Sequence, residues 1–248
     1  VENAHIDDVK EFFFKHYRPI NAILVVTGHV TTEQVKRLAQ KWFADIPMGD
    51  TSYRNLPQEP VQTTARKQEV HAAVPLDAFV KTWHMDSRLH KGYYVADMIT
   101  ELLGGGGSSR LYQALVKERQ LFSNLDCYHF GSIDAGLLTV EGKLVKGIKL
   151  EDAANAVDAE IEKLKHDLIS EHELQKVKNK TESVIAFEDM SIMSRANSLA
   201  MYELLGDANM MNTELGKFQE VTAEGLLQEA REIFREGNCN TLKYYAAN

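Results

Sequence analysis

The chain has 248 residues, 44% of them hydrophobic and 26% charged, so it reads as globular, with room for one large domain or slightly more. Its net charge of −8 argues against nucleic acid and anionic membranes as partners, because both attract positive surfaces. No apolar run approaches the roughly 20 residues that are needed to span a bilayer.

The first elements in chain order are a helix, a strand and a second helix. Apolar spacing predicts a helix over residues 5–18 that ends before Pro19, and the aliphatic stretch "NAILVVTGHV" predicts a buried strand. Thr31 and Gln34 predict a capping box at the start of "TTEQVKRLAQKWF". Residues 47–68 hold three of the five prolines and little apolar periodicity, so we predict a linker and a domain boundary there. The predicted helix faces carry Val9, Phe12, Phe13, His16 and Tyr17, and then Val35, Leu38, Ala39, Trp42 and Phe43.

After the linker, the predicted order is one strand, two helices, two strands, four helices and a final strand. The alternation in "LLTVEGKL" places Leu138, Val140 and Leu144 on one face of a strand, which is typical of a sheet covered on one side. The fold class that we predict is α+β, with a largely antiparallel sheet and helices packed on one face. The helix stripes that would cover it are Ala153, Val157, Ile161 and Leu164, and then Leu174, Val177, Thr181, Val184 and Ile185.

A faint internal repeat links the two ends of the chain. "DDVKEFFFKHYRPINAILVV" and "EGLLQEAREIFREGNCNTLKYY" both read as a helix followed by a strand, with Tyr17 matching Phe234 and Asn21 matching Asn238. The repeat suggests that residues 1–46 end one copy of a fold and residues 69–248 form another. The chain starts at Val1 rather than at a methionine, within a helical pattern, so we expect a piece of a longer protein. No signal peptide is visible.

The run "GGGGSSR" at residues 104–110 resembles a phosphate-binding loop at first sight. Such a loop needs a lysine followed by serine or threonine, but Arg110 follows here, and the preceding segment has helical spacing. We therefore expect glycines that turn the chain at a helix C-terminus, with Ser108 or Ser109 capping the next helix.

The stretch "HDLISEH" at residues 166–172 resembles the inverted zincin motif His-x-x-Glu-His. Its two histidines are six residues apart, which rotates them by about 240° on a helix, and Ser170 with Glu173 forms a capping box instead. His84 and His90 flank a loop-like segment without a third ligand. Residue patterns alone thus predict neither a metal site nor a catalytic centre.

The two cysteines, Cys127 and Cys239, are too few for a disulfide framework or a zinc ribbon. The sequence is compatible both with a disulfide bond between them and with two free thiols. It is likewise compatible with the bacterial periplasm and with the cytoplasm.

Several blocks, in order, resemble the M16 zinc metallopeptidases, which include pitrilysin and the mitochondrial processing peptidase. "DVKEFFFKHYRPINAILVVTGHVTTEQVKRLAQKWFADIP" resembles the segment that closes the first half of an M16 subunit. "YYVADMITELLGGGGSSRLYQALVKERQLF", "DAGLLTVEGKL" and "ISEHELQKVKNK" are similar to blocks of the second half. The resemblance implies the LuxS/processing-peptidase-like metallohydrolase fold. It divides the chain into the tail of the first half (1–46), a linker (47–68) and an inactive C-terminal domain (69–248).

The resemblance also implies where the chemistry lies. The family's first half carries His-x-x-Glu-His and zinc, so zinc would sit in a missing N-terminal half and this chain would hold no cofactor. In active members an arginine and a tyrosine seven residues apart in the second half reach the substrate. Val116 and Ser123 stand at these positions and supply no equivalent donor, so we expect no catalytic residue and an inactive chain. A substrate-proximal role is implied for Gly104, Gly105, Gly106, Gly107, Ser108, Ser109 and Arg110.

The implied function is that of a non-catalytic domain in the wall of a peptide-enclosing chamber and at a subunit interface. The implied partners are the missing N-terminal half, a second M16 subunit in a homo- or heterodimer, and a peptide substrate, but neither nucleic acid nor membrane. The alternative is a structural or assembly subunit with the same fold, like the core subunits of respiratory complexes.

Overall fold

The computed structural model describes residues 3–50, 56–131 and 133–247. The chain divides into two compact units, which are described separately. The first unit comprises residues 1–57 and 184–213, and the second comprises residues 58–183 and 214–248.

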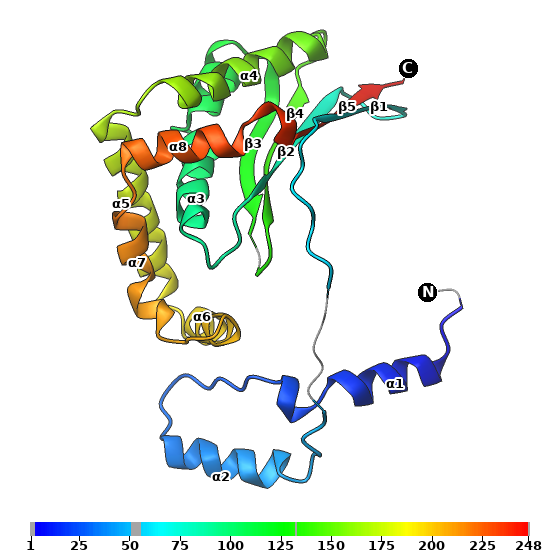
Figure 1. Cartoon of the computed structure of the whole chain (residues 1–248), viewed down its shortest axis with the longest axis vertical. Coiled ribbons are helices and arrows are strands. Elements are labelled where there is room, and N and C mark those ends of the chain that lie inside the picture. Colours follow the sequence, from blue (N-terminus) through cyan, green and yellow to red (C-terminus); the bar gives the residue numbers. More distant parts are fainter. Residues whose placement is uncertain (1–2, 51–55, 132, 248) are drawn as a thin grey trace. The chain divides into compact units, whose positions relative to one another are not determined.

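A five-stranded sheet forms the centre of the second unit (Figure 1). Its strands lie in the order β1-β5-β2-β4-β3. The β1–β5 pair is parallel, while the β5–β2, β2–β4 and β4–β3 pairs are antiparallel. The prediction of a largely antiparallel sheet is therefore confirmed. The strands are β1 (Arg66–Ala72), β2 (Ala78–Met85), β3 (Phe122–Phe130), β4 (Gly136–Leu144) and β5 (Cys239–Ala246).

Helices cover one face of this sheet and enclose the core with it (Figure 1). The sheet-covering helices are α3 (Lys91–Gly104), α4 (Leu150–His166) and α8 (Ala223–Ile233). Leu138, Val140 and Leu144 face these helices and are at most 1% exposed, as the alternation predicts. Each fully buried large apolar side chain stabilises the fold by roughly 1.5–3 kcal/mol. The largest side chains of this core include Phe79, Met98, Ile99, Leu102, Leu103, Phe122 and Leu164.

The order of elements differs from the prediction in two places. Two strands, β1 and β2, precede α3, because the turn around Pro75 divides the predicted single extended region. Five α-helices rather than four lie between β4 and β5. The extra boundary falls at Gly206, whose φ of +110° is a backbone conformation that favours glycine. The helices not yet given are α5 (Glu171–Glu188), α6 (Ile192–Leu204) and α7 (Met210–Gln219).

The predicted stripe on α5 is buried only along its first half. Leu174, Val177 and Thr181 are buried, but Val184 is 47% exposed. The change coincides with the border of the two units, because α5 belongs to the second unit only as far as Ser183. The stripe on α4, by contrast, is buried along its whole length, as predicted.

The first unit begins with two helices that expose their apolar faces. They are α1 (Ile6–His16) and α2 (Thr32–Phe43), with the short 3₁₀ helix η1 (Pro19–Asn21) after α1. The capping box of Thr31 and Gln34 is confirmed. Phe13 is 49% and Trp42 66% exposed, although both lie on faces that the spacing predicts to be buried.

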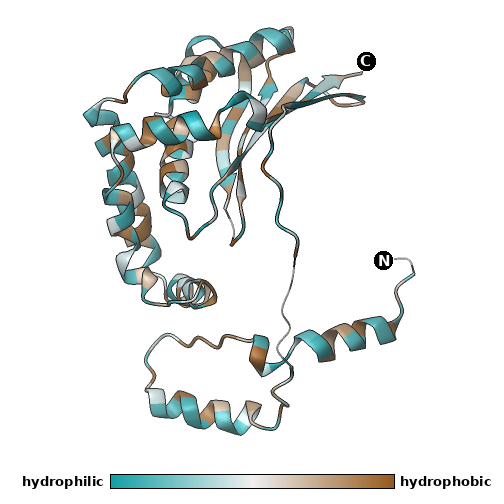
Figure 2. Ribbon diagram, viewed as in Figure 1, coloured by the Kyte–Doolittle hydropathy of each residue, from teal (hydrophilic) through white to brown (hydrophobic). Residues whose placement is uncertain are grey.

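The buried strand predicted from "NAILVVTGHV" is absent. Residues 22–27 belong to no strand, although Ala22 has the extended angles φ −116° and ψ 136°. Figure 2 shows the hydrophobic character of this segment, and Leu24 is 58% exposed. A strand requires hydrogen-bonded neighbours, and no described part of this chain supplies them.

The internal repeat extends to individual hydrogen bonds. After α1 the amide of Asn21 donates to His16 O at 3.2 Å, and after α8 the amide of Asn238 donates to Ile233 O at 2.8 Å. Each asparagine ends a 3₁₀ helix, η1 in the first copy and η3 in the second. The second copy differs in that Asn238 also donates to His84 O on β2 and leads into the paired strand β5. The bounds of η3 are Glu236–Asn238.

Candidate functional site

The glycine-rich turn follows α3, and three of its glycines are required by the backbone, including Gly105, whose Cβ atom would lie 2.5 Å from the backbone oxygen of Glu101. A Cβ atom on Gly104 would lie 2.4 Å from the backbone nitrogen of Cys127, so α3 approaches β3 more closely than any other residue allows. Gly106 has φ +90°, in the region that favours glycine. Gly107 meets no such constraint, and it forms the exposed tip of the turn together with Gly106 and Ser108.

Side chains of α5 hold the turn by its carbonyl groups. Lys176 Nζ donates to Ser108 O at 3.0 Å, and Lys180 Nζ donates to Gly105 O at 2.6 Å. Lys180 also forms an ion pair with Glu101. Cations at the C-terminus of α3 complement the negative end of its dipole. A phosphate loop instead presents backbone N–H groups to an anion, so this turn has the opposite polarity.

Arg110 anchors the end of the turn to α5. Its Nε and Nη2 atoms donate to the two carboxylate oxygens of Glu173, each at 2.9 Å. These hydrogen bonds lower the pKa of Glu173 below its ordinary value. The predicted capping box is also present, because Glu173 N donates to Ser170 Oγ at 3.2 Å. Arg110 is thus engaged in an internal ion pair.

The segment after the turn is a π-helix, η2 (Tyr112–Glu118). The prediction that Ser108 or Ser109 caps it is wrong, because Ser109 Oγ donates back to Gly106 O at 2.7 Å and η2 has no side-chain cap. Leu111 and Leu115 are fully buried and hold the segment against the core. π-helical segments are rare and occur frequently at functional sites.

Val116 and Ser123 lie on different elements. Val116 is half-buried on η2, and Ser123 is exposed near the start of β3. Ser123 Oγ donates to the backbone oxygen of Lys143 at 3.1 Å, so its hydroxyl hydrogen already has an acceptor. Val116 has no polar group. Neither side chain therefore offers a free donor to a peptide carbonyl.

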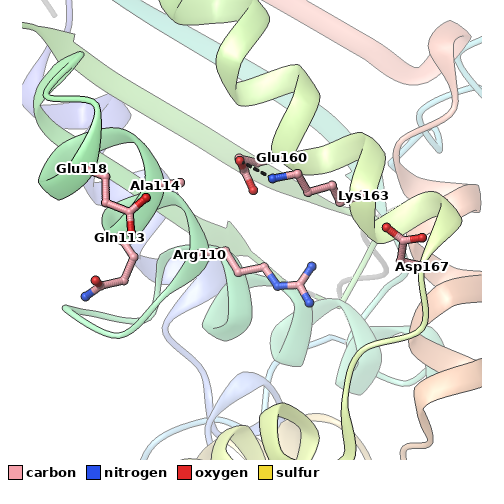
Figure 3. A pocket seen from close by; sticks show the side chains of 7 residues that line it. All are labelled: Arg110, Gln113, Ala114, Glu118, Glu160, Lys163 and Asp167. Atoms are coloured by element: carbon pink, nitrogen blue, oxygen red, sulfur yellow. Dashed lines mark hydrogen bonds and ion pairs between the residues drawn. The ribbon is translucent and has the colours of Figure 1, made fainter.

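A shallow pocket of about 410 Å³ lies between η2 and α4. Figure 3 shows its lining, with Arg110, Gln113, Ala114 and Glu118 on one side and Glu160, Lys163 and Asp167 on the other. Its two cations are already paired, Arg110 with Glu173 and Lys163 with Glu160 at 2.7 Å. The pocket therefore has no unpaired positive charge for an anionic ligand.

The histidines considered as metal ligands do not converge. His166 ends α4, is 71% exposed and contacts Glu162 at 3.3 Å, whereas His172 belongs to the next helix, α5. Among residues 3–50, 56–131 and 133–247, no three His, Cys, Asp or Glu side chains are placed to hold one metal ion.

Cys127 and Cys239 are free thiols. They lie on β3 and β5, and two strands separate these in the sheet, which corresponds to about 14 Å at the usual strand spacing. That is too far for a disulfide bond. In the part of the chain that the structure describes, no helix combines the length and the hydropathy of a membrane span.

Residues 3–181 match the protein family described as the peptidase M16 inactive domain. The chain belongs to the M16 peptidase family. It is similar to the zinc protease PqqE of Helicobacter pylori, with 27% identity over 247 residues that make up 98% of this chain and 55% of PqqE. The chain spans about half the length of the curated relatives that it matches.

Two solved structures share its fold. A protease from Helicobacter pylori superposes with a TM-score of 0.90 at 26% identity, over 98% of this chain and 60% of that one. A peptidase M16 inactive domain from Pseudomonas fluorescens gives a TM-score of 0.84 at 15% identity, over 99% of this chain and 58% of that one, and at this identity it supports the fold alone. The predicted family and fold class are confirmed.

Sequence reasoning missed the lysines that hold the M16 glycine turn. Glu173, Lys176 and Lys180 have the spacing of one helix face, which was a usable signal. Nothing in the sequence, however, connects that face to glycines about 70 residues earlier, because only side-chain contacts made in the folded chain bring α5 to the turn. The π-helical form of η2 likewise has no recognised local signal.

Proposed function

We propose that this chain is the non-catalytic C-terminal half of an M16 zinc metallopeptidase and forms part of a chamber that encloses peptides. The observation that carries the proposal is the match of residues 3–181 to the family's inactive domain. The relative PqqE is named a zinc protease, and about half of its length lies outside the match. In this proposal residues 1–46 close the N-terminal half, residues 47–68 are the linker, and residues 69–248 form the inactive domain.

The unpaired first unit supports a missing N-terminal half as the partner. In the second copy of the repeat, β5 lies between the parallel strand β1 and the antiparallel strand β2. The equivalent segment, residues 22–27, has the same preceding helix and asparagine but no neighbouring strand. We propose that the N-terminal half supplies both neighbours. It would then also cover the apolar faces of α1 and α2.

The division of labour follows from the side chains. The N-terminal half would hold zinc through His-x-x-Glu-His and a further glutamate, and zinc would activate the attacking water. In this half, Val116 and Ser123 offer no group that could grip a peptide carbonyl. A second M16 subunit, in a homo- or heterodimer, would supply the missing arginine and tyrosine. The exposed tip at Gly106, Gly107 and Ser108 would lie close to the enclosed peptide.

Mixing this chain with a separately produced N-terminal half tests the pairing. Trp42 is 66% exposed here, and we expect its fluorescence to shift to shorter wavelength as the N-terminal half covers α2. A Trp83→Phe background removes the signal of the other tryptophan, and a Trp42→Phe variant is the matched control. Co-elution without a shift, or no co-elution, would contradict the pairing.

The alternative function is a structural or assembly subunit with this fold. It would apply if the longer protein and its partner subunit both lack an intact His-x-x-Glu-His motif. Reading the motif in the longer sequence separates the two functions, and the pairing of the two halves is common to both.

A further inference from the structure

The strand β3 has an unpaired edge. It is nine residues long, lies at the margin of the sheet (Figure 1) and, in the part of the chain that the structure describes, pairs only with β4. Within the described residues, no other backbone hydrogen bond reaches residues 124–130. In an antiparallel pair, every second residue directs both its N–H and its C=O away from the neighbouring strand. The outer side of β3 therefore carries a row of free donors and acceptors.

The two edges of the sheet differ in their protection. The edge strand β1 carries the cations Arg66 and Lys67 at its start, and charged side chains of this kind discourage the addition of another strand. By contrast, no lysine, arginine or proline lies between Phe122 and Phe130, and only a bulge near Ser123 interrupts the start of β3. Residues 124–130 thus form the unguarded part of the sheet.

Two carboxylates face each other at this edge. Asp126 on β3 is the register partner of Glu141 on β4, on the face that the helices leave uncovered. Their contacts are hydrogen bonds from Asn124 and Tyr128, and no described cation forms an ion pair with either. Like charges directly opposite each other in a sheet are unfavourable. A cation on an added strand would lie beside Asp126 and relieve this repulsion.

An aromatic pair continues along the same face. Tyr128 and Phe130 contact edge to face, with ring centroids 5.2 Å apart, and Phe130 is 65% exposed. Side chains on neighbouring strands interact when they are opposite or diagonal, so an added strand would place an apolar residue against these rings.

We propose that residues 124–130 of β3 bind an extended polypeptide by strand addition and select a basic side chain opposite Asp126. A strand added in register can hydrogen-bond to the whole of such a row of backbone donors and acceptors. The net charge of −8 adds long-range attraction for a basic segment. The inference rests on the proposed peptide-binding function. It assigns the binding to the edge of β3 and predicts a preference for peptides with a basic residue.

The test is binding of a fluorescein-labelled capped peptide of alternating threonine and valine with one central lysine. Fluorescence anisotropy with the 248-residue chain measures the affinity. Asp126→Lys is expected to weaken binding about fivefold and Asp126→Asn about twofold, because the cross-strand ion pair is reversed or removed. The same peptide with glutamate in place of lysine should bind Asp126→Lys more tightly than the unaltered chain. Glu69→Lys, an equal charge change on β1, is the matched control; it alters the long-range attraction as much as Asp126→Lys but removes no charge beside the added strand, so it should change both affinities much less.

The backbone part of the inference has its own readout. A peptide that is N-methylated at alternate positions on its pairing edge should lose binding, and the unmodified peptide should slow hydrogen exchange within residues 124–130. Equal binding of the methylated peptide, or equal weakening by Glu69→Lys, would overturn the proposal. Concentration-dependent dimerisation that Asp126→Lys abolishes would show that a second copy of the chain occupies the edge instead.

The outcome is separable from that of the proposed function. If the chain binds the peptide but the longer protein has no zinc-dependent activity, the binding site on β3 is supported and the proposed peptidase function is wrong. If the longer protein cleaves peptides while this chain binds none, only the inference about β3 is lost.

Discussion

Replacing Asn238 with alanine should destabilise the second unit strongly. Asn238 is 1% exposed, and its amide donates to His84 O at 2.9 Å and to Ile233 O at 2.8 Å. One such bond contributes about 1 kcal/mol net, but losing its donor leaves a buried carbonyl unsatisfied at a cost of about 1–3 kcal/mol. Two carbonyls lose their donor here. We therefore expect a loss of about 3 kcal/mol in the free energy of unfolding, or roughly 6–12 °C in Tm.

Urea unfolding followed by the fluorescence of Trp83 measures this loss. Trp83 is 3% exposed and contacts Phe234 edge to face at 5.0 Å, so it reports on the region beside Asn238. A Trp42→Phe background removes the second fluorophore. A loss in the free energy of unfolding below about 0.5 kcal/mol would refute the idea that the Asn238 amide stabilises the second unit by hydrogen bonding to both α8 and β2.

Asn21→Ala is the matched control within the repeat. In this chain Asn21 is exposed, and its side-chain amide donates to His16 O. We therefore expect the substitution to lower the free energy of unfolding by no more than about 0.5 kcal/mol. In the longer protein the same substitution should cost about as much as Asn238→Ala, because the missing half would bury the amide beside a neighbouring strand. Equal, small effects in both contexts would contradict the proposed pairing.

Three further predictions concern the glycine turn and its surroundings. Gly104→Ala should lower the stability by about 1–3 kcal/mol, because its Cβ would meet Cys127 N at 2.4 Å, whereas Gly107→Ala should be nearly neutral. Equal thermal melts of the two variants would contradict this. Glu173→Gln should cost about 1 kcal/mol at neutral pH, since Arg110 lowers the pKa of Glu173 in the folded state. That contribution is present above the ordinary value of 4.5 and is lost as the pH falls through the lowered folded value, so the melts of variant and parent should converge in acid and not at neutral pH. Burial raises the pKa of the Cys127 thiol, so in a Cys239→Ser background, which removes the half-buried second thiol, Ellman's reagent should not modify the chain before unfolding, and rapid modification of this folded variant would contradict the burial of Cys127.

Local patterns predicted the second unit well, because its sheet and helices find their partners within the chain. The alternation around Val140 and the stripe around Val157 both mark buried faces correctly. The same rules predicted burial around Leu24 and Trp42, where the side chains are exposed. Hydrophobic periodicity indicates that a face is meant to be covered, but it does not say whether the covering element belongs to the same chain.

The candidate site was less predictable than the fold. The glycine run could be assigned to a helix end from the missing lysine and the helical spacing before it. The hydrogen bonds from Lys176 and Lys180 to the glycine turn join segments that are far apart in the sequence, so no local pattern encodes them. The free edge of β3 likewise follows only from the strand order, because the alternation of "NLDCYHF" is the same for an edge strand and a central one.

The central claim is that this chain is the half of an M16 peptidase that does not perform the chemistry. The most direct test measures zinc by mass spectrometry and peptide cleavage for this chain and for the longer protein, the latter with its partner subunit where one exists. We predict no bound zinc and no cleavage for this chain, and about one zinc with chelator-sensitive cleavage for the complete assembly. Stoichiometric zinc with chelator-sensitive cleavage by the 248-residue chain alone would contradict the account.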